Sequence, residues 1–155
     1  LRPNGFMQNL YGPTQGFDAQ RICRLPLGEA KYCFIDAQDI AATAAAALTE
    51  DGHAGKVYDL TGPEALSYAE AARIISKTTG ETFTFVDIPP QECRADLLAK
   101  GIDAWFVDEI LEWFKLFRHG RVGGVSDAVE TVSGRAPRAL NDFVQGNLAN
   151  FGEPS

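Results

Sequence analysis

The side chains best able to do acid-base, metal or nucleophilic chemistry form no familiar catalytic pattern in this chain. His53 and His119 belong to no HExxH motif and have no neighbour at metal-ligand spacing. None of the four tyrosines is followed four residues later by lysine, so the proton-relaying Tyr-x-x-x-Lys pair is missing, and there is no GxSxG nucleophile motif. The motifs therefore predict no metal site and assign no catalytic residue.

The three cysteines, Cys23, Cys33 and Cys93, are an odd number without CxxC spacing. Neither a disulfide framework nor a zinc site follows from such a set. We interpret them as buried or semi-buried thiols of a cytoplasmic protein.

Charge and hydropathy exclude two classes of partner. The formal charge of -7 repels a phosphate backbone, so we expect no nucleic acid and no anionic membrane as partner. No apolar run approaches the length of about 18 residues that a membrane span needs.

Phosphate-binding glycine motifs are also missing, since the glycines never fall at GxGxxG or P-loop spacing. Residues 1–10 nevertheless resemble the exit of a buried strand into an active-site loop. We therefore expect the chain to be the second half of a nucleotide-binding α/β protein, divided at a strand beside the cofactor.

Alternating strand-like and helix-like segments predict the fold of residues 1–88. Asp36 and Asp39 can cap one helix, and Ser67 with Glu70 forms a capping box before another. Strand, helix, strand, helix, strand at this spacing predicts a mainly parallel sheet, half of a doubly wound fold. We expect a loop at 11–27, strands at 32–35, 56–60 and 82–88, and helices at 36–49 and 67–80. The first helix has an alanine run at 44–47, which predicts close packing against the strands.

After Pro89 and Pro90 the pattern is helical only. A helix at 91–100 is followed by one that Asp103 caps, with Ile102 and Val107 at hydrophobic-staple positions. We further expect a glycine connector (Gly120, Gly123, Gly124), a short helix at 126–132 and a final helix from about 140 to 151.

The helix that follows Asp103 is apolar over roughly two thirds of its circumference. A helix that contributes only a core stripe would be less apolar. It is either sandwiched in a helical subdomain, or covers the core with one side and a ligand pocket or a partner with the other.

Four segments, in order and at the expected spacing, resemble the NmrA-like family of atypical short-chain dehydrogenases. They are residues 1–9 (LRPNGFMQN), 34–41 (FIDAQDIA), 58–64 (YDLTGPE, followed by Ser67 and Tyr68) and 131–137 (TVSGRAP). The resemblance implies an α/β fold, here the C-terminal half of a Rossmann-type, mainly parallel sheet with a small helical substrate domain. Residues 1–88 would belong to the NAD(P)-binding domain with interleaved substrate-domain segments, and residues 89–155 to a mostly helical substrate or lid region.

The resemblance also implies site residues. Ligands of a Rossmann sheet lie beyond the carboxyl ends of its strands, so Pro3, Asn4, Gly5 and Phe6 would face the nicotinamide end of NAD(P), with NADP the expected form. Met7 and Asn9 would border the substrate, and the aromatic residues Trp105, Phe106 and Trp113 would cover it. Because the glycine motif is missing, we expect these 155 residues alone to be inactive and to bind cofactor poorly.

Two functions remain open for the intact protein. One is an NAD(P)H-dependent reductase that transfers hydride to a small quinone- or azo-type acceptor. The other is a non-catalytic sensor of the NAD(P) redox state that acts through a regulatory protein partner. A homo-oligomer is compatible with either function.

Overall fold

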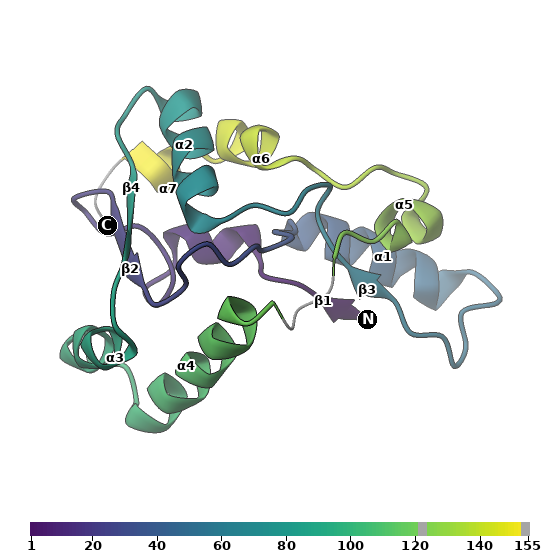
Figure 1. The fold of residues 1–155 in the computed structure, drawn as a ribbon. Helices are drawn as coiled ribbons and strands as arrows, with labels where there is room; N and C mark the ends of the chain where they lie inside the picture. The colour runs from purple at the N-terminus through teal and green to yellow at the C-terminus, as the bar shows by residue number, and fades with distance from the viewer. Residues whose placement is uncertain (121–123, 153–155) are drawn as a thin grey trace.

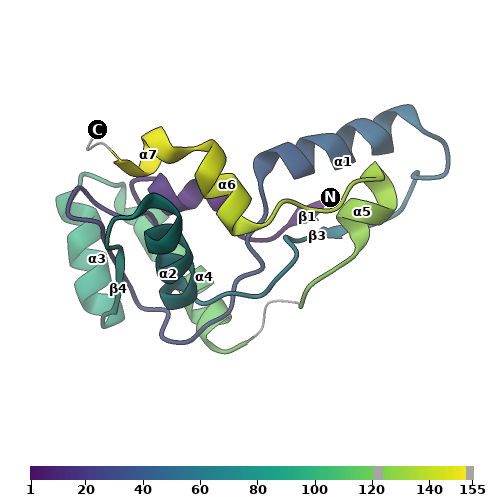
Figure 2. The same cartoon turned by 90° about the horizontal axis from the view of Figure 1, so that it is seen from above.

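Residues 1–120 and 124–152 are described by a computed structural model, and their helices and strands gather at two ends of the molecule (Figure 1). One end holds β1 (Arg2–Pro3), β3 (Asp59–Leu60), α1 (Ala37–Thr49) and α5 (Ala128–Ser133). The other holds β2 (Ile22–Leu25), β4 (Thr84–Asp87), α2 (Tyr68–Thr79), α3 (Pro90–Ala99), α4 (Ala104–Arg118), α6 (Leu140–Gly146) and α7 (Leu148–Gly152). Figure 2, seen from above, shows the same separation.

The first end is a short parallel sheet with two helices beside it. β1 pairs with β3 in parallel, with Arg2 opposite Asp59 and Pro3 opposite Leu60. α1 begins at its predicted cap, where the Asp36 carboxylate accepts from Gln38 N. α1 packs mainly along α5 (Figure 2), and its Ile40 packs against the small core that includes Leu60 of β3. A small core of Ile35, Leu60, Ala128 and Val129 fills this end.

The second end contains a strand that local sequence pattern did not reveal. β2 pairs with β4 in parallel, from Ile22 opposite Thr84 to Leu25 opposite Asp87. The predicted loop at 11–27 is therefore wrong over these four residues. Only Cys23 and Leu25 of β2 are buried, so the alternation is short, and the partner strand lies far along the chain. A 3-10 helix, η1 (Met7–Tyr11), precedes it.

The parallel direction of strand pairing is confirmed, but the strands form two separate two-stranded sheets. The strand predicted at 56–60 shrinks to β3, its last two residues. Residues 32–35 form isolated bridges in place of a strand: Tyr32 pairs with Leu66 in antiparallel fashion and Ile35 with Phe6 in parallel. Because the two bridges have opposite directions, no continuous ladder forms through this segment.

The predicted capping box and the predicted C-terminal glycine of α2 are both confirmed. The Ser67 hydroxyl accepts from Glu70 N at 3.2 Å, and the Glu70 carboxylate accepts from Ser67 N at 2.7 Å. Gly80 ends α2 with φ +79°, a backbone conformation that favours glycine. The predicted final helix is two helices, α6 and α7, interrupted at Asn147.

The helix predicted after Asp103 is α4, and its cap is confirmed. Asp103 Oδ1 accepts from Trp105 N at 2.9 Å and from Phe106 N at 3.3 Å. Val107, the residue of the predicted hydrophobic staple that lies within the helix, is fully buried. Of the predicted glycine connector that follows α4, Gly123 lies outside the described residues.

The larger buried cluster extends from Met7 to Phe151 and draws on both sides of residue 88. All three cysteine side chains are buried, as predicted. The proposed division into residues 1–88 and 89–155 stays a prediction. Among the described residues, no helix has the length and apolar character required to cross a membrane.

Candidate functional site

A cavity of about 1120 Å³ opens between the carboxyl ends of β1 and β3 and one side of α4. Its floor comes from the segment that leaves β1, its far wall from α4, and its rim from residues that follow β3 and precede α5. The cavity thus lies where an α/β sheet binds ligands, beyond the carboxyl ends of parallel strands.

The structure brings eight of the nine predicted site residues together around this cavity. They are Pro3, Asn4, Gly5, Phe6, Asn9, Trp105, Phe106 and Trp113. Met7 does not line the cavity. Its side chain is 1% exposed and packs in the main core, while its backbone N donates to Ile35 O at 2.8 Å. The 3-10 helix that begins at Met7 turns this side chain inward and leaves Asn9 at the cavity.

Asn4 is held rigidly at the floor. Its backbone N donates to Leu60 O at 2.9 Å, which extends the pairing of β1 with β3 by one bond. Its side-chain Oδ1 accepts from Gly5 N at 2.8 Å and from Cys33 N at 3.3 Å. The amide Nδ2 is thus the group that Asn4 can offer to a ligand, because Oδ1 already accepts two bonds.

Gly5 is required by the packing of an aromatic ring. A Cβ on Gly5 would lie 2.7 Å from Tyr32 Cδ1, closer than real carbon atoms approach. Its carbonyl accepts from Ile35 N at 3.0 Å. A side chain at position 5 would therefore displace Tyr32 from the cavity wall.

Tyr32 is the centre of a buried aromatic stack below the cavity. Its ring stacks on Phe117 of α4, with centroids 3.8 Å apart and planes 3° from parallel, and meets Tyr68 edge-on at 5.4 Å. Burial raises the pKa of Tyr32 and of Tyr68, so both phenols stay protonated at neutral pH. The stack therefore supplies a flat apolar surface and no ready acid or base.

The α4 wall presents large aromatic side chains that the core does not cover. Trp105 is 71% exposed and Trp113 58% exposed, although both line the cavity. Glu109 lies between them, one helical turn from each. The adjoining side of α4 is buried in the core through Val107, Ile110, Phe114 and Phe117, and the last three of these also reach the cavity. Of the two alternatives that its apolar surface left open, α4 covers the core with one side and a cavity with the other.

The rim opposite α4 is held by a pair of hydroxyl contacts. Ser126 N donates to Thr61 Oγ1 at 2.9 Å, and Thr61 Oγ1 donates to Ser126 O at 3.3 Å. This pair fastens the segment before α5 to the end of β3 and places Asp127 at the cavity.

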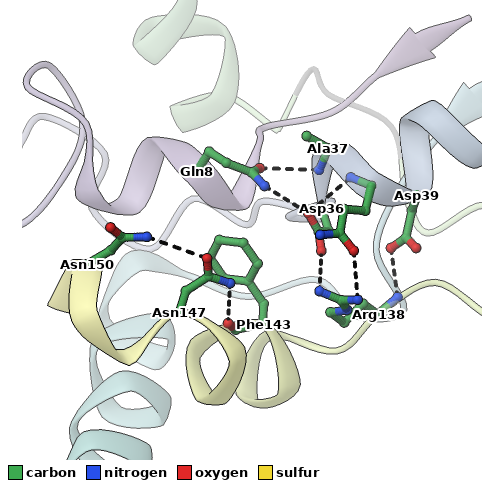
Figure 3. A network of polar contacts seen from close by, with 9 residues as sticks. Gln8, Asp36, Ala37, Asp39, Arg138, Phe143, Asn147 and Asn150 are labelled. Carbon is green, nitrogen blue, oxygen red and sulfur yellow. Dashed lines mark hydrogen bonds and ion pairs between the residues drawn. The ribbon is translucent and has the colours of Figure 1, made fainter.

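A polar network behind the floor fixes the start of α1 (Figure 3). The buried Asp36 carboxylate accepts from Gln8 Nε2 at 2.8 Å and forms an ion pair with Arg138 at 2.9 Å. Asp39, predicted as a cap, accepts from Arg138 N at 2.8 Å. The network joins η1, α1 and the segment before α6, three parts of the chain that are distant in sequence.

Sequence reasoning missed several cavity residues, including Gln15, Tyr32, Thr61, Glu109 and Asp127. Two of them had a usable signal. Thr61 directly follows a parallel strand, and Glu109 shares a helix face with the two tryptophans. Gln15, Tyr32 and Asp127 reach the cavity through contacts between distant segments, which no local pattern reports.

The polar groups and the aromatic side chains that line the cavity fit a flat aromatic ligand. Aromatic side chains line two sides, and a few polar groups, such as Asn9 and Asn4, can orient a ring. These residues suit the ring-bearing end of a nicotinamide cofactor together with a second aromatic molecule. Within residues 1–120 and 124–152 no glycine-rich turn is present that would hold the cofactor's phosphates.

Residues 1–144 match the NmrA-like family, and the chain belongs to that family. Its structural neighbours include an NADPH-dependent quinone oxidoreductase of Escherichia coli and a nucleoside-diphosphate-sugar epimerase of Staphylococcus aureus, with TM-scores of 0.83 and 0.78. The predicted α/β fold class is thereby confirmed, and the chain covers about half of each of these neighbours.

Two curated relatives and one solved structure show the range of similarity. An NAD(P)H azoreductase of Xenophilus azovorans is 36% identical over 98% of this chain and 53% of its own length. An uncharacterized oxidoreductase of Bacillus subtilis is 38% identical over 96% of this chain and 53% of its own length. An NADPH-dependent quinone oxidoreductase of Escherichia coli, solved with NADPH, superimposes with a TM-score of 0.84 at 22% identity, over 95% of this chain and 52% of that one. The chain spans about half the length of the curated relatives it matches.

Proposed function

We propose that this chain forms the acceptor side of an NAD(P)H-dependent reductase that acts on quinone- or azo-type molecules, with NADP as the working cofactor. The observation that carries the proposal is the aromatic cavity at the carboxyl ends of β1 and β3. The similarity to an NAD(P)H azoreductase and to an NADPH-dependent quinone oxidoreductase supports it.

In this proposal the residues after β1 face the nicotinamide. Asn4 offers its Nδ2 donor to the carboxamide or the ring edge, from a side chain that two accepted hydrogen bonds hold still. Phe6 supplies an apolar wall, and Pro3 with Gly5 shapes the backbone floor. Orientation of the reacting ring by fixed groups is a large part of what a protein contributes to hydride transfer.

The aromatic side chains of α4 hold the acceptor against that floor. Trp105, Phe106 and Trp113 cover a flat ring and exclude water from it, and Asn9 borders the same space. When bound, reduced NAD(P) supplies two electrons and one hydrogen as hydride. A quinone or azo acceptor takes up this hydride and one proton from water, so the reduction balances without a side-chain proton donor.

Steady-state turnover tests the proposal directly. The full-length protein is assayed for NADPH and NADH oxidation with a panel of quinones and azo dyes. We expect turnover with at least one acceptor class and a lower KM for NADPH than for NADH. Tight cofactor binding without turnover of any acceptor would contradict the reductase and favour the redox-sensing alternative.

A pair of variants on α4 connects turnover to the cavity. Trp113→Ala removes a cavity wall, and we expect about a tenfold higher acceptor KM because one aromatic contact is lost. Leu116→Ala is the matched control, since Leu116 is exposed on the same helix but does not line the cavity. Equal effects of the two substitutions would count against the assigned wall.

A further inference from the structure

The charges around the cavity are unevenly placed. Among the described residues that line it, Arg2 is the one basic residue, against the three acidic residues Asp59, Glu109 and Asp127. Arg2 and Asp59 are opposite one another in the pairing of β1 with β3, which places one positive and one negative residue side by side at the sheet end. The α4 wall carries a single charge, that of Glu109.

Glu109 differs from the other carboxylates of α4. Asp108 forms an ion pair with Arg94 at 2.7 Å, and Glu112 pairs with Lys115 at 3.2 Å. In the part of the chain that the structure describes, the Glu109 carboxylate has neither an ion-pair nor a hydrogen-bond partner. Asp108 and Glu112 of α4 are therefore paired with basic residues, whereas Glu109, which lines the cavity, has no such partner among the described residues.

The neighbours of Glu109 strengthen the effect of its charge on a ligand. Trp105 and Trp113 lie one turn before and one turn after it and line the same cavity. The face of an indole ring attracts cations, and a tryptophan is the strongest side chain of this kind. A positive group beside Glu109 would be attracted by its carboxylate and would lie near two tryptophan side chains, whereas a negative group would be repelled by the same carboxylate.

We propose that Glu109, flanked by Trp105 and Trp113, selects acceptors whose aromatic ring carries a positive charge. This inference rests on the proposed reductase function and names the acceptor class of the same cavity. The electron balance is unchanged: the ring takes up hydride from the nicotinamide and a proton from water, and the positive substituent stays as it was.

Three naphthoquinones test the selection by kinetics in the full-length protein: an uncharged one, one with a trimethylammonium-methyl group and one with a sulfonate. The kcat/KM of each charged quinone is divided by that of the uncharged one. This ratio cancels any loss of activity that a substitution causes equally for all three quinones. In Glu109→Gln we expect the ratio for the cationic quinone to fall about three- to tenfold and the ratio for the anionic quinone to rise. The change should shrink at high salt, because this carboxylate is exposed.

Glu112→Gln is the matched control, because it removes an acid of the same helix outside the cavity lining. Both ratios should match those of the unsubstituted protein. If the ratio for each charged quinone is the same in Glu109→Gln as in the unsubstituted protein, the assignment of Glu109 is overturned.

A binding measurement separates this inference from the reductase function. Calorimetric titration with naphthyl-trimethylammonium and with naphthalene sulfonate, neither of which can be reduced, should show tighter binding of the cation and loss of that preference in Glu109→Gln. Selective binding without turnover of any quinone would reject the reductase and retain the selection. Turnover without charge preference would reject the selection and retain the reductase.

Discussion

The carboxylate of Asp36 and the guanidinium of Arg138 form an ion pair with Oδ2 and Nη1 2.9 Å apart. Asp36 is 1% exposed, whereas the Arg138 side chain remains 35% exposed. The pair joins the start of α1 to the segment before α6 (Figure 3). It therefore fixes the position of α1 relative to the helices of the other end.

Removal of Arg138 should destabilise the protein substantially. Arg138→Met leaves a buried carboxylate without its cation, and we expect a loss of about 2 kcal/mol in the free energy of unfolding. This is below the ~3–5 kcal/mol typical of fully buried pairs because Arg138 is partly exposed. Urea denaturation of the full-length protein measures the loss. Arg135→Met, an exposed arginine of the same segment, is the control, and similar losses in the two variants would contradict the role of the pair.

A second prediction concerns the crossing of two chain segments beneath the cavity. A Cβ on Gly62 would lie 1.9 Å from the carbonyl oxygen of Phe34, so Gly62→Ala forces these backbones apart. We expect a loss of about 3 kcal/mol or more. Gly146→Ala is the comparison, because nothing lies within 4 Å of a Cβ there, and it should be neutral or slightly stabilising. Thermal unfolding of both variants decides, and a stable Gly62→Ala protein would refute the close approach.

The capping box of α2 predicts a pH dependence. The ammonium of Lys31 and the backbone N of Ser67 lower the pKa of Glu70 to about 2. A depressed carboxyl pKa stabilises the fold above its unfolded value of about 4.3, and this contribution is lost as pH falls from about 5 towards 2. We expect Glu70→Gln to cost about 0.5–1 kcal/mol at pH 7.

Denaturation curves at pH 7 and near pH 3 test the sign of this effect. The gap between the unsubstituted protein and Glu70→Gln should narrow at the lower pH. Glu64→Gln serves as control, because Glu64 is exposed and has no ion-pair partner among the described residues. A gap that widens on acidification would show that the charge of Glu70 is not what stabilises α2.

Local signals made much of the fold predictable. Asp36, Ser67 and Asp103 each cap the helix that the sequence assigned to them, because capping depends on residues within one turn. β2 was not predictable in this way. Its four residues alternate too briefly, and the pairing that makes them a strand comes from residues 84–87.

The same distinction between local patterns and distant contacts applies to the residues of the site. The residues after β1 and the aromatic face of α4 could be placed at one site, because a family pattern and a helical period indicate them. Tyr32 could not, since its position depends on stacking with Phe117 and on the absence of a side chain at Gly5. Burial of Met7 likewise follows from the 3-10 turn that begins there, a feature with no sequence signal.

The central claim is that an aromatic acceptor binds between the end of β1 and the tryptophan face of α4. The two tryptophans of the chain, Trp105 and Trp113, both line that cavity. Their indole Nε1–H signals in nitrogen-proton NMR spectra therefore report on it, and Trp105→Phe and Trp113→Phe assign them. On titration with an uncharged naphthoquinone in the presence of NADP, we predict that both signals shift and saturate together. Saturable binding of the quinone with both signals unmoved would contradict the account.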